Sequence, residues 1–219
     1  MTQSPPDKLA PEQEVDEVQT FDATDMYSDV SYELRIPKAR IAVLIGSKGE
    51  TKKRIEQDTN TKLDIDSAEG EVTIIGSDVI TSYVVKDIVK AIGRGFNPEI
   101  ALQLLKPEYS FELIEMTELA KHKNQLARVK GRIIGKAGKT REIIEKLMDV
   151  SISVFGKTVG ILGPIERVTA AKQAVDMILD GSPHANVYRW LEKKKKSFTR
   201  DELIGNNRVE FKEGMEQYR

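Results

Sequence analysis

Two short glycine motifs are the residues of this sequence best suited to contact a ligand. Gly-Ser-Lys-Gly at residues 46–49 and Gly-Lys-Ala-Gly at residues 135–138 each follow an apolar stretch and precede a charged amphipathic segment. Glycine allows a sharp turn and a close approach of the backbone to a ligand, and free amides at the start of a following helix attract phosphate. Two copies 89 residues apart in the same context indicate a duplicated site. The pair predicts contacts with a nucleic-acid backbone.

Basic side chains flank both motifs, and aliphatic residues that could wall a groove lie nearby. Such a groove admits single strands, because paired bases cannot reach it. The groove walls expected are Ile41, Ile45, Leu63 and Ile65 in the first copy and Ile133, Ile134, Ile152 and Val154 in the second, although a single isoleucine is more often a core residue. The residues expected to contact RNA are Gly46, Ser47, Lys48, Gly49, Lys52, Lys53, Arg132, Gly135, Lys136, Ala137, Gly138, Lys139 and Arg141.

The net charge of −1 hides an asymmetry along the chain. Residues 1–30 hold eight acidic side chains against Lys8 alone, so the remaining residues carry 33 basic against 27 acidic side chains. We expect residues 1–28 to form an acidic disordered tail. The absence of cysteine excludes disulfides and thiolate metal sites and fits a reducing cytoplasm. With neither a signal-like N-terminus nor a long apolar run, a cytoplasmic protein without membrane contact is expected.

Periodicity places each motif between two helices. Alternation predicts a strand over 31–36, and helices are expected over 38–45 and 50–59. Strands over 61–67 and 71–75 come next. Ser77 or Asp78 then caps a helix that ends at Gly93 and Gly95. Its predicted inward face consists of Ile80, Val84, Ile88 and Ala91.

The second half repeats this order, which indicates internal duplication. Strands are expected over 109–116, 150–155 and 158–162, and helices over 126–134, 140–148 and from Pro164 to Gly181. The last of these carries an apolar stripe of Val168, Ala171, Val175 and Ile178. We therefore expect domains at 29–95 and 109–182, and a basic helix and tail at 183–219. Residues 96–108 between the domains are expected to form a packed helical segment, because Ile100, Ala101, Leu104 and Leu105 recur at helical spacing.

Each repeat resembles a type I KH domain, the module whose GXXG loop clamps nucleotide backbone. This resemblance implies an α+β fold of two β-α-α-β-β-α units, each a three-stranded sheet packed on helices. Residues 95–105 and 179–188 make the tandem similar to the small-ribosomal-subunit assembly factors called partner of Nob-one, in the archaeal form. The resemblance implies binding near the 3′ end of small-subunit ribosomal RNA, beside the maturation endonuclease. It also implies contact with the alpha subunit of translation initiation factor two. Lys52 and Arg141 depart from the apolar residue common in KH domains and predict a more polar groove floor.

The sequence gives weaker support for nucleotide-binding loops, metal sites and catalytic residues. Gly138-Lys139-Thr140 resembles the end of a P-loop, but that motif requires glycine where Ile133 stands. Asp64 and Asp66 share a strand face and could bind a metal, although solvent-facing acids are far more common. The histidines, His122 and His184, are isolated, and no nucleophile and base pair is evident, so neither an enzyme nor a cofactor is expected. Two alternatives stay open: a general RNA adaptor in RNA degradation or translation initiation, and a protein-interaction scaffold with one silent KH unit.

Overall fold

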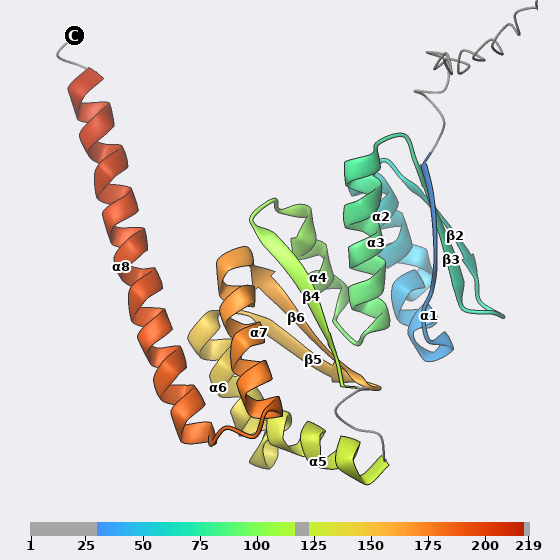
Figure 1. The fold of residues 1–219 in the computed structure, drawn as a ribbon. Helices are drawn as coiled ribbons and strands as arrows, with labels where there is room; N and C mark the ends of the chain where they lie inside the picture. Colours follow the sequence, from blue (N-terminus) through green and yellow to red (C-terminus); the bar gives the residue numbers. More distant parts are fainter. Residues whose placement is uncertain (1–29, 117–122, 217–219) are drawn as a thin grey trace, which may run out of the picture.

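The computed structural model describes residues 30–116 and 123–216, which form two α+β units placed side by side (Figure 1). The tail predicted over residues 1–28 and His122 lie outside this range. The first unit has the predicted element order. Its elements are β1 (Val30–Arg35), α1 (Lys38–Ile45), the 3₁₀ turn η2 (Ser47–Gly49), α2 (Glu50–Thr59), β2 (Lys62–Asp66), β3 (Glu71–Gly76) and α3 (Val79–Gly93).

The second unit repeats that order. Its elements are β4 (Tyr109–Glu115), α5 (Lys123–Ile134), η4 (Lys136–Gly138), α6 (Lys139–Met148), β5 (Ser151–Phe155), β6 (Thr158–Pro164) and α7 (Ile165–Leu179). In each unit the last strand pairs antiparallel with the other two, so the sheet orders are β1-β3-β2 and β4-β6-β5. The predicted fold class, α+β with three-stranded sheets packed on helices, is confirmed.

Helix α3 is present where predicted, but its predicted inward face is wrong in part. Asp78 caps the helix, since its carboxylate accepts a hydrogen bond from the Thr81 amide at 2.8 Å and another from the Thr81 hydroxyl. These hydrogen bonds hold the pKa of Asp78 below its usual value. Ile80 is 75% exposed. The buried face is instead Ser82, Val85, Ile88, Val89, Ala91 and Ile92.

The segment between the units is folded and packed, as expected. It contains α4 (Pro98–Ala101) and the 3₁₀ turn η3 (Leu102–Leu105). Ala101, Leu102 and Leu104 are buried in the first core, whereas Leu105, which was expected to pack, is 37% exposed. The change from α-helical to 3₁₀ geometry alters the residue spacing and explains this difference.

The outer face of the second sheet packs against the end of α3 and the segment directly after it, and this contact joins the two units. Phe96 meets Phe111 of β4 edge to face, with ring centroids 5.8 Å apart. Leu162 of β6 belongs to the first unit's core. The Ser153 hydroxyl donates to the Arg94 carbonyl at 2.8 Å. As a result β6 is buried on both faces, whereas β3, its counterpart, is buried mainly on one.

Arg40 of α1 braces the same joint from the first unit. Its guanidinium donates to the carbonyls of Ile92 at 2.8 Å and Phe96 at 2.6 Å. Partial burial lowers the pKa of Arg40 below its usual value, yet arginine keeps its charge at neutral pH. The two bonds therefore satisfy carbonyls at the end of α3 with a charged donor.

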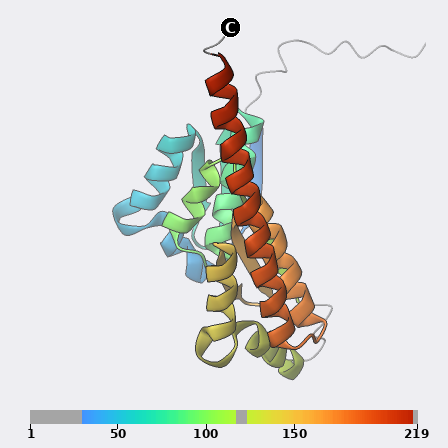
Figure 2. The same cartoon turned by 90° about the vertical axis from the view of Figure 1, so that its left-hand side faces the viewer.

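The predicted C-terminal basic helix is α8 (His184–Glu216), which extends past the two units (Figures 1 and 2). Its first turns complete the core of the second unit, because Val187 and Leu191 are fully buried there and Trp190 packs against them. The four lysines at 193–196 are exposed.

We expect Gly160→Ala to loosen the joint between the units. A Cβ at Gly160 would lie 2.7 Å from the ring of Phe96 and 3.1 Å from that of Phe111. Overpacking of this kind costs about 1–3 kcal/mol, so the free energy of unfolding in urea should fall by that amount. Gly131→Ala is the matched control, since nothing lies within 4 Å of a Cβ there and alanine in a helix should add about 0.5–1 kcal/mol. Equal stabilities for the two variants would contradict the proposed packing.

Candidate nucleic-acid interface

The two Gly-x-x-Gly turns have the same backbone geometry. In each, the first, third and fourth residues have positive φ, including one residue that is not glycine. The φ values are 74°, 52° and 78° for Gly46, Lys48 and Gly49, and 75°, 52° and 79° for Gly135, Ala137 and Gly138. The left-handed region is costly for residues with a Cβ, so an identical conformation in both copies indicates that the turn shape itself is retained.

The first glycine of each turn is also required by close packing. A Cβ at Gly46 would lie 2.8 Å from the amide nitrogen of Thr51, and one at Gly135 would lie 2.8 Å from that of Thr140. The second glycine has space, with nothing within 4 Å of a Cβ at Gly138. The sequence prediction missed the two threonines, although their recurrence in the same position after each motif was a usable signal.

The predicted phosphate contacts lie on exposed surface. Both turns lie at the edge of the molecule (Figure 2). Helices α2 and α6 begin directly after them, and neither has a side-chain cap on its first amides. Such free amides and the positive end of the helix dipole attract an anion. The exposed predicted residues around the two turns are Ser47, Lys48, Lys53, Lys136, Ala137, Lys139 and Arg141.

Lys52 and Arg141 lie over matching carboxylates on their own helices. Lys52 is 3.9 Å from Glu56, and the Glu56 carboxylate accepts a hydrogen bond from the amide of Leu63 at 2.9 Å. In the second unit Arg141 is 3.4 Å from Glu145, which accepts from the amide of Ile152 at 2.8 Å. Each carboxylate therefore ties the helix after the turn to the edge strand of the sheet, and the more polar groove floor expected from Lys52 and Arg141 stays a prediction.

Four of the eight expected groove walls are buried, and for the other four a place in a groove stays a prediction. Ile41, Leu63, Ile133 and Ile152 are buried in the cores, at 3%, 0%, 0% and 4% exposure, and cannot contact a ligand without unfolding. The half-buried members are Ile45, Ile65, Ile134 and Val154. Alternation along a strand sends neighbouring side chains to opposite faces, but it does not show which residue at an edge stays accessible.

Arg132 is not free to reach the second turn in the way that was expected. Its guanidinium donates to the Ser182 carbonyl at 2.9 Å, and its own carbonyl lies 2.9 Å from Nε2 of His184. Ser182 lies in the connection that leads from α7 to α8, and His184 is the first residue of α8. Arg132 therefore ties α8 to the helix before the turn, and its expected contact with RNA stays a prediction.

The remaining candidates have structural roles. The Asp66 carboxylate accepts from the amides of Ala68 and Glu69 and shapes the turn between β2 and β3. In the described part of the chain, no three of its histidine and acidic residues gather in a metal-binding arrangement. Over the same residues, no helix combines the length and apolarity needed to cross a membrane. Tyr188 and Trp190 pack on the body of the second unit, the former through the Thr140 hydroxyl and the latter against the core.

A Gly-x-x-Gly turn between the first two helices of a β-α-α-β-β-α unit, present twice, defines a tandem KH-domain protein. Family models agree: one described as a eukaryotic-type (type I) KH domain matches residues 110–196, and a KH-domain model matches residues 31–82. A KH domain-containing protein of Methanocaldococcus jannaschii is 48% identical over 171 residues, which are 76% of this chain and 75% of the relative. The chain belongs to the KH-protein family that includes archaeal Dim2p and the eukaryotic Pno1 proteins.

Two further relatives show the range of this family. The chain in a solved a/eIF2alpha-aDim2p-rRNA complex from Pyrococcus horikoshii is 46% identical with a TM-score of 0.73, covering 80% of this chain and 99% of that one. The pre-rRNA-processing protein pno1 of Emericella nidulans is 33% identical over 112 residues, 49% of this chain. This chain spans only 43% of the length of that eukaryotic relative.

We expect the two glycines of one turn to differ in their tolerance to alanine. Gly138→Ala should cost only the left-handed backbone penalty, about 1–2 kcal/mol, because its Cβ has space. Gly135→Ala adds a clash with the Thr140 backbone and should lower the free energy of unfolding by clearly more. Urea titration of both variants measures the difference. A Gly135→Ala protein as stable as Gly138→Ala would show that the turn does not need the close packing described.

Proposed function

We propose that this chain binds single-stranded RNA through both KH units and acts as a ribosome-biogenesis factor at the 3′ end of small-subunit ribosomal RNA. The observation that carries the proposal is the retained left-handed geometry of both exposed turns. A turn needed only to connect two helices has no reason to keep the same strained residue, Lys48 or Ala137, in two diverged copies.

The chemistry of each unit supports this function. Two consecutive phosphates can lie against the glycine turn, where backbone amides and exposed lysines neutralise them. Bases then cross the half-buried aliphatic side chains beside the turn toward the edge strand. A duplex keeps its base edges inside its grooves, so this arrangement favours an unpaired strand.

The relatives support the particular RNA and partners proposed. One is named a pre-rRNA-processing protein, and another was solved in complex with rRNA and a/eIF2alpha. We extend to this chain an interaction with the alpha subunit of the initiation factor. From the resemblance to the family of assembly factors we also propose that the maturation endonuclease is a partner. The same resemblance supports a cytoplasmic location and RNA binding without catalysis.

Reversing the charge of either turn should remove RNA binding without unfolding the protein. Lys136→Asp with Ala137→Asp, and Ser47→Asp with Lys48→Asp, place carboxylates where phosphates are expected. All four positions are exposed, and aspartate tolerates the left-handed conformation of residues 48 and 137. Affinity for a ribosomal 3′-end oligonucleotide, measured by fluorescence anisotropy, should fall about 100-fold or more for each double variant, with an unchanged Tm. Wild-type affinity in both would refute the proposal.

The salt dependence of binding should separate an RNA-binding protein from a protein-interaction scaffold. For a single strand, log K falls against log salt concentration with a slope of about −0.7 per phosphate neutralised. If both turns bind phosphates, the wild-type protein should show a steeper slope than either double variant, because each variant has lost the contacts of one turn. A slope near zero would instead favour the protein-interaction scaffold, and a slope that one of the double variants leaves unchanged would show that its KH unit is silent.

A further inference from the structure

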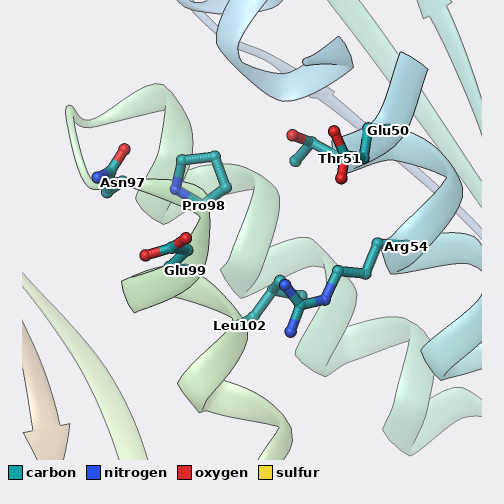
Figure 3. Close-up of a pocket in the computed structure, with 7 residues that line it drawn as sticks. All are labelled: Glu50, Thr51, Arg54, Asn97, Pro98, Glu99 and Leu102. Atoms are coloured by element: carbon teal, nitrogen blue, oxygen red, sulfur yellow. The ribbon is translucent and has the colours of Figure 1, made fainter. Parts of the chain in front are cut away.

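A cleft of about 270 Å³ lies between α2 and α4 (Figure 3). Glu50 and Thr51 border it just after the first glycine turn, and Arg54 reaches from the same helix toward Leu102 on the opposite wall. Asn97 and Glu99 complete the polar lining. Lys52 and Glu56 are not among the residues that line it, and Glu56 bonds to the edge strand instead, so the groove expected there does not account for this cleft.

The duplication shows that the fold does not require an opening here. Helices α3 and α7 have equal length, and the glycine shortly after each has positive φ, 100° for Gly95 and 95° for Gly181. Helices α4 and α8 then begin after connections of equal length. Leu102 and Tyr188 are each the fifth residue from that start, and Thr51 and Thr140 occupy equal positions after the two turns.

In the second unit this space is closed. The hydroxyl groups of Tyr188 and Thr140 are 2.9 Å apart, and Thr140 is only 4% exposed. In the first unit Leu102 stands in place of the tyrosine. The hydroxyl of Thr51 has no hydrogen-bond partner among the described residues and lines the open cleft. The first unit therefore lacks a planar, hydroxyl-bearing ring at the position where the second unit supplies its own.

The first unit has also changed the helix face that borders this space. Ile143 and Leu147 of α6 are half-buried, and α6 packs against α8. The equivalent residues of α2 are Arg54 and Asp58, an exposed ion pair with Nε 3.7 Å from the carboxylate. An apolar helix would desolvate this pair, so a protein helix packed as α8 is packed does not fit the cleft.

We propose that the cleft receives one base of the bound RNA, from the nucleotide that flanks the segment held at residues 46–49, and that this base carries an exocyclic amino group. The inference rests on the proposed function, because the strand must first be bound at the turn. A base is a planar ring with polar edges, the shape that Tyr188 supplies in the second unit. The guanidinium of Arg54 can stack on such a ring and Leu102 can pack against its face.

The charges that line the cleft favour a base over a phosphate as its ligand. Glu50 and Glu99 repel phosphate, so the backbone is expected to stay at the turn. Carboxylates accept hydrogen bonds from the amino groups of cytosine, adenine or guanine, while the Asn97 amide and Arg54 can donate to ring nitrogen or carbonyl acceptors. Uracil has no amino group and should bind least well.

The test uses the second unit as a template. Leu102→Tyr in the full chain copies Tyr188 and should close the cleft against Thr51 without changing the charge. Leu105→Tyr, on the same 3₁₀ turn but outside the cleft, is the control. Anisotropy is measured with ribosomal 3′-end oligonucleotides in which one nucleotide at a time is replaced by an abasic site or by uridine. Wild-type protein should show one position, flanking the segment at the first turn, where either replacement weakens binding about tenfold.

Leu102→Tyr should weaken binding to the unmodified RNA by the same factor, about tenfold. Replacing the base at that position should then cause no further loss of affinity, because the protein variant and the RNA change remove the same contact. Leu105→Tyr should match wild type. If Leu102→Tyr lowers the Tm, the same affinities are measured with Arg54→Lys, which keeps the positive charge but loses the planar guanidinium. If Leu102→Tyr and Arg54→Lys both bind with wild-type affinity while the charge-reversed double variants lose binding, the cleft proposal alone is overturned. Wild-type affinity in the charge-reversed turns as well would overturn RNA binding itself.

Discussion

The contact between Phe96 and the bare backbone of Gly160 holds the two halves of the molecule together. It lets the first unit cover the outer face of the second sheet, a face that an isolated KH unit would leave to solvent. The burial of β6 on both faces and the edge-to-face pair with Phe111 lie at that close approach, and the hydrogen bonds of Arg40 fix the end of α3 and the Phe96 carbonyl beside it. Because this joint is packed, not tethered, the two glycine turns have a set spacing and direction, which suits a single RNA strand that meets both.

Duplication produced two units whose ligand-facing chemistry is alike and whose outer layers differ. The link from helix to edge strand is the same in both, with Glu56 bonded to the amide of Leu63 and Glu145 to that of Ile152. The helix after α3 or α7 is different in each unit, since α4 ends after one turn and leads into β4, whereas α8 continues along α6 and α7. Because α4 and η3 lead directly into β4, this segment does not continue along α2 as a long helix, as α8 does along α6.

Local signals in the sequence were enough for the elements and the turns, while long-range contacts were not visible in it. Alternation, the Asp78 cap and the paired glycines depend on neighbours along the chain, and all of them are found in the structure. The exposure of Ile80, the burial of Ile41 and the bonding of Arg132 to a carbonyl 50 residues away depend on tertiary packing. An isoleucine on a helix fits either environment, so only its neighbours in space decide between groove and core.

Glycine turns that bind the RNA backbone, as proposed, cannot by themselves select a sequence. Their proposed partners are phosphates, which are the same at every nucleotide. Discrimination must come from side chains that meet base edges, and the groove walls left accessible, such as Ile45 and Val154, are aliphatic and offer only shape. Polar edges of the bases therefore need partners elsewhere. In the first unit the cleft between α2 and α4 offers such partners from Glu50, Arg54, Asn97 and Glu99.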